Sequence, residues 1–115
     1  MAEIWHNPRC SKSRAALALL EERGYDAKVV LYLTTPPSER RLREVIEALG
    51  GDAHALVRSK EAAYKELGLS KTSTQEQLIA AMVAHPALIE RPLVITDLGT
   101  RIGRPTEALD AIVKG

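Results

Sequence analysis

The chain has 115 residues, with 16 Lys and Arg against 15 Asp and Glu, so its formal net charge is +1. This near balance argues against a nucleic-acid binder that relies on bulk positive charge, and one Trp with three Tyr offers no stacking platform for single strands. No apolar run approaches the ~20 residues of a membrane span. We therefore expect one domain over residues 1–115, acting without nucleic acid or membrane as a partner and as a monomer.

The single cysteine, Cys10, bears on the cellular compartment. A lone cysteine cannot form an internal disulfide, which is typical of reducing compartments. The sequence also enters a strand-like segment within three residues and shows no apolar leader. We expect a cytoplasmic protein.

The first third of the chain predicts a βαβ unit. A short strand covers residues 3–6, a helix runs from Cys10 to about Arg23 with Gly24 as its stop, and a second strand covers residues 28–32. The second strand is a nearly continuous apolar run, which predicts burial on both faces. A right-handed crossover makes the two strands parallel.

The middle of the chain predicts a helical insert at about residues 38–85. Ser38 can cap a first helix that ends at Gly50, short helices follow at 53–57 and 61–67, and Thr74 with Gln77 fits the capping box of a last helix. Both longer helices carry apolar faces, formed by Leu42, Val45, Ile46 and Leu49 in the first and by Leu78, Ile79, Met82 and Val83 in the last.

The last quarter predicts a β-hairpin and a closing helix. Strands are expected at 91–96 and 100–102, joined by a turn at 97–99, and Pro105 suits the first turn of the helix, whose apolar residues are Leu109, Ile112 and Val113. The element order predicts an α/β, thioredoxin-like fold. Its mixed four-stranded sheet is flanked by helices, with the helical insert between the βαβ unit and the hairpin.

Cys10 is the candidate nucleophile because it stands where a strand passes into a helix. Free N–H groups and the helix dipole favour a thiolate there, and His6, Arg9, Lys12 and Arg14 add basic groups. The alternative is a buried, inert thiol. Ser13 takes the place of the second cysteine in a C-x-x-C motif, so any redox cycle needs an external thiol. A phosphatase loop requires an arginine six residues after its cysteine, whereas Arg14 comes four after Cys10.

The histidines do not predict a metal site. His6 and Cys10 are too few ligands for zinc, and His54 and His85 lack ligand spacing with them. His6 can be a structural residue at the strand end or can tune the thiolate.

Three arginines, Arg58, Arg91 and Arg104, each adjoin a break or an element end. Any one of them can be a solvated surface residue. As a set they can bind a tetrahedral oxyanion, because guanidinium groups hold such anions in bidentate fashion. Spacing alone does not show whether they converge.

Taken together, these motifs resemble the ArsC-like, glutaredoxin-linked and glutathione-dependent arsenate reductases. The resemblance covers nearly the whole chain and rests on His6-Asn7-Pro8-x-Cys10-x-x-Ser13-Arg14, Leu31-Tyr32-Leu33, Leu56-Val57-Arg58, Tyr64-Lys65-Glu66-Leu67-Gly68-Leu69, Ile89-x-Arg91-Pro92-Leu93-Val94 and Gly99-Thr100-Arg101-x-x-Arg104-Pro105. The chain departs from well-studied plasmid-borne members at Ser11-Lys12, where they carry Gly-Thr, and in lacking their C-terminal extension.

The resemblance implies the roles of the site residues. Cys10 would attack arsenate, and Arg58, Arg91 and Arg104 would bind the oxyanion. His6, Ser13 and Arg14 would support the thiolate, and the bond before Pro92 would be cis. It implies no bound cofactor and no metal, with glutathione as co-substrate and glutaredoxin as protein partner.

Two other functions stay open at the level of sequence. A monothiol thiol-transfer (deglutathionylating) protein would use Cys10 and Ser13 and tolerate loss of Arg58. A transcriptional regulator of the Spx type would bind RNA polymerase, but such proteins usually carry C-x-x-C, and here Ser13 stands in place of the second cysteine.

Overall fold

The structure is a computed structural model that describes residues 2–114, and these residues form two compact units. The sheet unit comprises residues 2–35 and 91–114, and the helical unit comprises residues 36–90. The helical unit matches the expected insert with slightly wider bounds. The expectation of a single domain stays a prediction.

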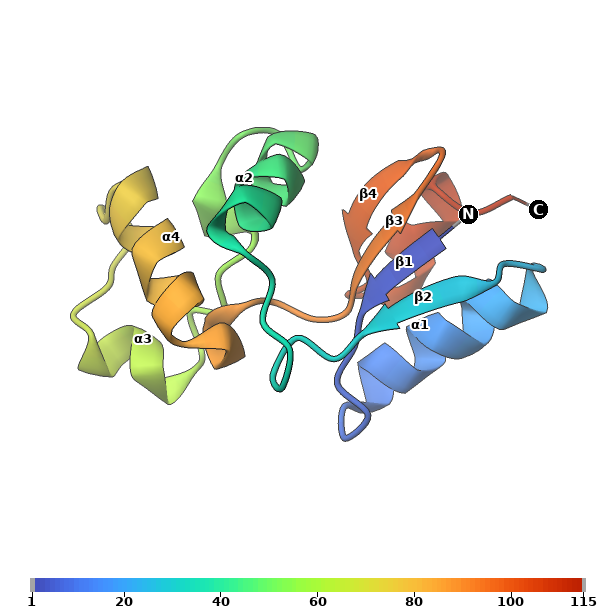
Figure 1. Cartoon of the computed structure of the whole chain (residues 1–115), viewed down its shortest axis with the longest axis horizontal. Helices are drawn as coiled ribbons and strands as arrows, with labels where there is room; N and C mark the ends of the chain where they lie inside the picture. The colour runs from blue at the N-terminus through green and yellow to red at the C-terminus, as the bar shows by residue number, and fades with distance from the viewer. Residues whose placement is uncertain (1, 115) are drawn as a thin grey trace. The chain divides into compact units, whose positions relative to one another are not determined.

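The sheet unit is built on a four-stranded sheet in the order β2-β1-β3-β4, as Figure 1 shows. The strands are β1 (Ala2–Trp5), β2 (Ala27–Val30), β3 (Leu93–Thr96) and β4 (Gly99–Ile102). β1 pairs in parallel with β2 and antiparallel with β3, which in turn pairs antiparallel with β4. This confirms the mixed sheet, the parallel βαβ unit and the closing hairpin.

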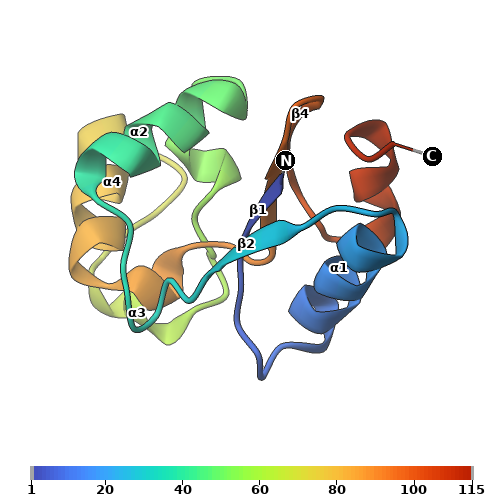
Figure 2. The same ribbon diagram turned by 45° about the vertical axis from the view of Figure 1, so that its right-hand side comes forward.

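One face of this sheet is covered by α1 (Ser11–Glu22) and by the 3-10 helix η3 (Thr106–Ala111), which lie side by side in Figure 2. Gly24 follows α1 at a φ of +83°, a conformation open mainly to glycine, which confirms the predicted stop. Among residues 2–114, the core between sheet and helices contains Ala2, Ile4, Ala16, Leu20, Tyr25, Val94, Leu109, Ile112 and Val113.

Two predictions for this unit are wrong. The second strand ends at Val30 and is an edge strand, with Lys28 and Val29 exposed, so it is not covered on both faces. An apolar run shows that a strand can be buried, but whether it lies at the edge of the sheet depends on the order of the strands. The closing helix is 3-10 rather than α, and Pro105 precedes it as the cap residue, although Leu109, Ile112 and Val113 are buried as expected.

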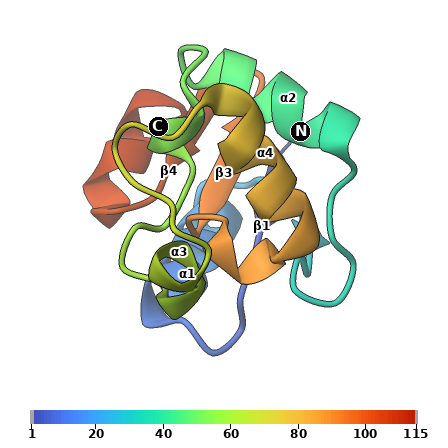
Figure 3. The same cartoon turned by 90° about the vertical axis from the view of Figure 1, so that its left-hand side faces the viewer.

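The helical unit contains α2 (Glu39–Ala48), α3 (Ala62–Glu66) and α4 (Gln75–Ala84), with 3-10 turns η1 (Ala53–Ala55) and η2 (Pro86–Leu88). Figure 3 shows α4 in front, with α2 and α3 to either side of it. Ser38 caps α2 by accepting a hydrogen bond from the N–H of Arg41, and Thr74 forms the predicted capping box with Gln77. Both predicted caps are confirmed. They could be predicted because each depends on residues only three positions apart.

The apolar face predicted for α4 is correct in part. Leu78, Ile79 and Met82 are buried, but Val83 is 40 % exposed. Val57, which precedes α3, and Ile89, which follows α4, form an antiparallel β-bridge. Over residues 2–114, no helix combines the length and the apolar character needed to cross a membrane.

Candidate active site

Cys10 occupies the N-cap position of α1, immediately before Ser11. Its backbone is extended, and its N–H donates to the carbonyl of Asn7 at 3.0 Å while its carbonyl accepts from the N–H of Arg14 at 3.0 Å. The thiol is partly exposed. The cysteine therefore lies at the strand-to-helix junction where it was predicted, and solvent reaches it.

The surroundings lower the pKa of the Cys10 thiol below its ordinary value. Burial raises this pKa, but the N–H of Ser13, the guanidinium of Arg91 and the N–H of Lys12 together outweigh it. Each of these three groups is a hydrogen-bond donor that favours the anionic sulfur over the neutral thiol. The result is an accessible thiol with enhanced thiolate character.

His6 and Ser13, on either side of Cys10 in sequence, form a buried hydrogen-bonded pair. The Nδ1 atom of His6 lies 2.6 Å from the Ser13 hydroxyl oxygen, which also accepts the N–H of Asn7 at 3.0 Å. Because this N–H can only donate, the hydroxyl hydrogen is free to point at His6 Nδ1. The Ser13 side chain thus stabilises the segment from His6 to Ser13 by hydrogen bonds, and its backbone N–H favours the Cys10 thiolate.

His6 is not a cationic neighbour of the thiolate. Burial, followed by the positive charge of Arg14, lowers the pKa of His6. An imidazole with a lowered pKa is neutral at pH 7. Arg14 itself donates from Nη1 to the carbonyl of Pro8 at 2.8 Å, which closes the loop from the other side.

Arg91 and Arg104 lie together in the sheet unit. Arg104 Nη1 is 3.3 Å from the carbonyl oxygen of Arg91, to which it donates. Between them, the N–H of Gly103 donates to the carbonyl of Pro92 at 2.8 Å, and a Cβ at Gly103 would come within 2.9 Å of the Pro92 ring. A side chain at Gly103 would push these segments apart. The Arg91–Pro92 and Arg104–Pro105 bonds are both cis.

Arg58, the third predicted oxyanion ligand, belongs to the helical unit. Its side chain is only 17 % exposed, and it forms ion pairs with Glu90 (Nε to Oε1, 3.4 Å) and Glu61 (Nη1 to Oε2, 4.0 Å). Neither glutamate was singled out from the sequence. The i, i+3 spacing of Glu61 could have indicated its contact, but Glu90 is brought to Arg58 by the bridge between Val57 and Ile89.

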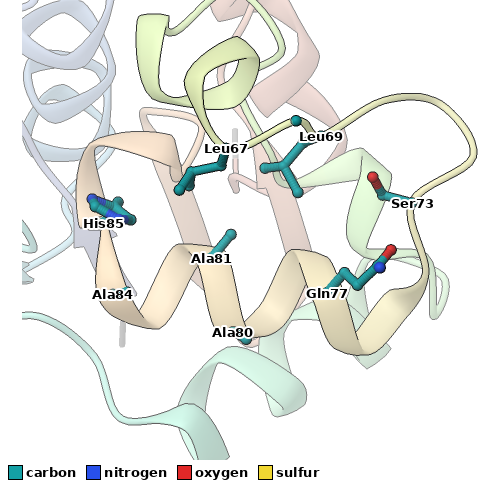
Figure 4. Close-up of a pocket in the computed structure, with 9 residues that line it drawn as sticks. Leu67, Leu69, Ser73, Gln77, Ala80, Ala81, Ala84 and His85 are labelled. Carbon is teal, nitrogen blue, oxygen red and sulfur yellow. The ribbon is translucent and has the colours of Figure 1, made fainter.

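A groove of about 420 Å³ lies in the helical unit between α4 and the segment that follows α3. Figure 4 shows Leu67 and Leu69 directed towards Ala81, with His85 at one end and Ser73 and Gln77 at the other. None of its lining residues is a predicted site residue. Across residues 2–114, no three His, Cys, Asp or Glu side chains are grouped so that they could hold a metal ion.

Comparisons with known proteins agree on one family. The model of the ArsC family matches residues 5–112. An arsenate reductase of Neisseria meningitidis is 48% identical over 96% of this chain and 97% of its own length, and the E. coli protein YfgD, described as uncharacterized, is 50% identical over 96% and 95%. The solved arsenate reductase of Vibrio cholerae aligns with a TM-score of 0.91 at 45% identity, covering 97% of both chains.

Proposed function

This chain belongs to the ArsC family, and from that premise we propose that it reduces arsenate to arsenite with the Cys10 thiolate as nucleophile. The observation that carries the proposal is the lowered pKa of an accessible thiol beside the Arg91 guanidinium. A thiolate supplies the nucleophile, and a fixed cation beside it stabilises charge on the oxygens of an incoming oxyanion. The relatives named arsenate reductase support the choice of arsenate.

The first step forms a bond between Cys10 sulfur and As(V), and one arsenate oxygen leaves as water after protonation. Arg104 donates a hydrogen bond to the carbonyl of Arg91, whose guanidinium acts on the Cys10 thiol, and we assign both arginines, with Arg58, to the arsenate oxygens. Guanidinium groups keep their charge at all relevant pH values and bind two oxygens of one anion in parallel. They therefore neutralise the charge that builds up as the sulfur attacks.

The electrons come from thiols outside the chain, because Cys10 is its only cysteine. We assign the next step to a glutathione thiolate, which replaces a second oxygen so that arsenic carries two sulfurs. A glutaredoxin thiolate then attacks the glutathione sulfur and forms a disulfide with it. The electron pair of the broken sulfur–arsenic bond remains on arsenic, giving As(III).

Hydroxide finally replaces the Cys10 sulfur at arsenic, which releases arsenite and restores the thiolate. The reaction oxidises two thiols to one mixed disulfide and reduces arsenic by two electrons, so the cycle closes without a second cysteine in the chain. Its need for reduced glutathione fits our expectation of a cytoplasmic location.

The test is arsenate-dependent oxidation of NADPH by the purified protein with glutathione, glutaredoxin and glutathione reductase, beside Cys10→Ser. We expect turnover by the wild type and none by the variant, because a hydroxyl at this position is not ionised at neutral pH. Far-UV circular dichroism of both proteins checks that they are folded. Arsenate-dependent turnover retained by Cys10→Ser would remove the nucleophile assignment.

The same assay separates this function from thiol transfer, which the C-x-x-S loop and the lowered pKa of the Cys10 thiol also favour. A thiol-transfer protein should reduce a glutathionylated peptide at Cys10 without arsenate. Activity on the peptide without any arsenate-dependent oxidation of NADPH would overturn the reductase proposal in favour of thiol transfer.

A further inference from the structure

Arg58 is a cation held between two carboxylates within the helical unit. Glu90 Oε1 lies 3.4 Å from its Nε, and Glu61 Oε2 lies 4.0 Å from its Nη1. The side chains are 17 % exposed for Arg58, 25 % for Glu90 and 32 % for Glu61. At such partial burial, solvent and salt screen the charges less than on an open surface.

The backbone fixes this arrangement. Val57 and Ile89 form an antiparallel bridge, flanked by hydrogen bonds from the N–H of Arg58 to the carbonyl of Leu88 and from the N–H of Glu90 to the carbonyl of Leu56, both 2.7 Å. Arg58 and Glu90 are therefore diagonal neighbours on one face of the bridge, a position from which long side chains reach one another.

Glu61 reaches Arg58 by a different, local route. The N–H of Glu61 donates to the carbonyl of Arg58 at 3.2 Å, which closes a turn immediately before α3. Two independent backbone features, a bridge and a turn, thus direct acidic side chains at the same guanidinium.

The two carboxylates leave Arg58 neutralised but not fully hydrogen-bonded. Two carboxylates face this guanidinium, so much of the positive charge of Arg58 is compensated before an anion arrives. Yet Nη1 is buried and has no hydrogen-bond partner among the described residues, since Glu61 stands at 4.0 Å. Buried donors in native proteins usually have a partner, so an unpaired one fits a group that receives its partner from elsewhere.

We propose that Glu90, assisted by Glu61, is a positioning and selectivity residue for the oxyanion site: it holds the Arg58 side chain and cancels its charge while no substrate is bound. This inference rests on the proposed function, in which Arg58 binds arsenate oxygens. Glu90 acts through Arg58 and touches no reacting atom.

Cancelling the charge has a use because inorganic phosphate has the shape and charge of arsenate but is not reduced by thiols. Strong binding of any free oxyanion would leave the site filled by phosphate. If Arg58 binds the free oxyanion weakly but is already positioned for the charge that builds up when the sulfur attacks, it stabilises the transition state more than the bound substrate. Arsenate is then turned over, and phosphate does not fill the site.

The test compares Glu90→Gln with the wild type, with inorganic phosphate as the binding probe. Phosphate affinity is measured by NMR titration of the arginine Nε–H resonances, and arsenate kinetics by the coupled assay. Removing one negative charge should tighten phosphate binding and lower the KM for arsenate, each about 3- to 10-fold. Loss of the anchor for Arg58 should lower kcat by a similar factor.

Two variants separate charge from general damage. Glu90→Asp retains the carboxylate, so it should keep the phosphate affinity of the wild type. Glu76→Gln is the matched control, because it removes an exposed glutamate that pairs with Arg43 elsewhere in the same unit, and it should change neither KM nor kcat. In the Arg58→Ala background, Glu90→Gln should have no further effect on phosphate binding.

The outcomes distinguish this inference from the proposed function. If the wild type shows no arsenate turnover but Glu90→Gln tightens phosphate binding through Arg58, the reductase proposal fails and the assignment of Glu90 stands. If turnover is present and Glu90→Gln changes neither phosphate affinity nor KM, the assignment of Glu90 is overturned. A fall in kcat alone, with KM and phosphate affinity unchanged, would also overturn it.

Discussion

Arg91 in the sheet unit and Arg58 in the helical unit are both partly buried arginines that we assign to one anion, and they contact different kinds of group. Arg91 faces the Cys10 thiol and favours its ionisation, while its backbone carbonyl accepts a hydrogen bond from a second cation, Arg104. Arg58 faces the carboxylates of Glu61 and Glu90. Residue type alone would have given the two arginines the same role.

The comparison shows that the role expected of a guanidinium depends on the groups that it contacts. A cation beside a thiol lowers the pKa of that thiol, because it stabilises the anion. A cation already paired with carboxylates offers an anion mainly geometry, because much of its charge is compensated. Arg91 should therefore act on the nucleophile, and Arg58 on oxyanion orientation.

The largest effect in this comparison is expected from Arg91→Ala. Loss of the guanidinium removes a stabiliser of the thiolate, so the pKa of the Cys10 thiol should rise. Since Arg91 is also assigned to the arsenate oxygens, kcat/KM for arsenate should fall roughly 100- to 1,000-fold. The pKa change is measured from the pH dependence of iodoacetamide alkylation, which reports the thiolate directly.

A matched control for Arg91 is Arg101→Ala. Arg101 lies exposed on β4 of the same unit and is not among the groups that shift the Cys10 pKa. Its alkylation profile should coincide with that of the wild type. If Arg91→Ala and Arg101→Ala gave the same profile, Arg91 would not be the cation that activates the thiol.

A smaller effect is expected from Arg58→Ala. Losing a charged donor to substrate should lower kcat/KM for arsenate roughly 10- to 100-fold. Activity on a glutathionylated peptide should change little, because that reaction needs the thiol and not an oxyanion site. The two activities are measured on the same preparation, and an equal loss in both would mean that Arg58 supports the fold rather than the oxyanion.

The fold was predictable from sequence where the signal is local. The caps of α2 and α4 rest on hydrogen bonds between residues three positions apart, and Gly24 ends α1 by its own backbone freedom. The predicted burial of β2 was wrong because it depends on which strand stands next to it in the sheet, which no short window contains.

In the candidate site, too, the features with a local sequence signal were predictable and those that depend on distant residues were not. Cys10 at the N-terminus of α1 follows from a local strand-to-helix pattern, whereas Arg91 is 81 residues away in sequence. Its position before Pro92 marked it as a candidate oxyanion ligand, but only the family resemblance placed it in the same site as Cys10. The pairing of Arg58 with Glu90 was not predicted at all. It depends on a single bridge between Val57 and Ile89, and one bridged pair leaves no periodic pattern to detect.

The smallest effect concerns pH and compares His6 of the sheet unit with Glu76 of the helical unit. Burial and Arg14 lower the pKa of His6, so the folded protein binds a proton there less readily than the unfolded chain. The neutral His6 therefore makes its full contribution to the free energy of unfolding above pH about 6.5, the pKa of histidine in the unfolded chain. This contribution is lost as the pH falls from there through the lowered pKa of the folded state. Arg43 lowers the pKa of Glu76, whose contribution is lost only at more acidic pH, below about 4.3.

The two pH windows do not overlap, so a single series of urea unfolding curves separates them. Between pH 7.5 and pH 5.5, the wild-type midpoint should fall, and His6→Gln, which can still hydrogen-bond the Ser13 hydroxyl, should flatten that dependence. Glu76→Gln should leave the slope in this range unchanged. A wild-type midpoint that stays constant over this range would mean that His6 takes up a proton in place, with a cation beside the Ser13 hydroxyl. The Ser13 hydroxyl would then bind a cation, so the segment that carries Cys10 would contain a positive charge in addition to Arg91.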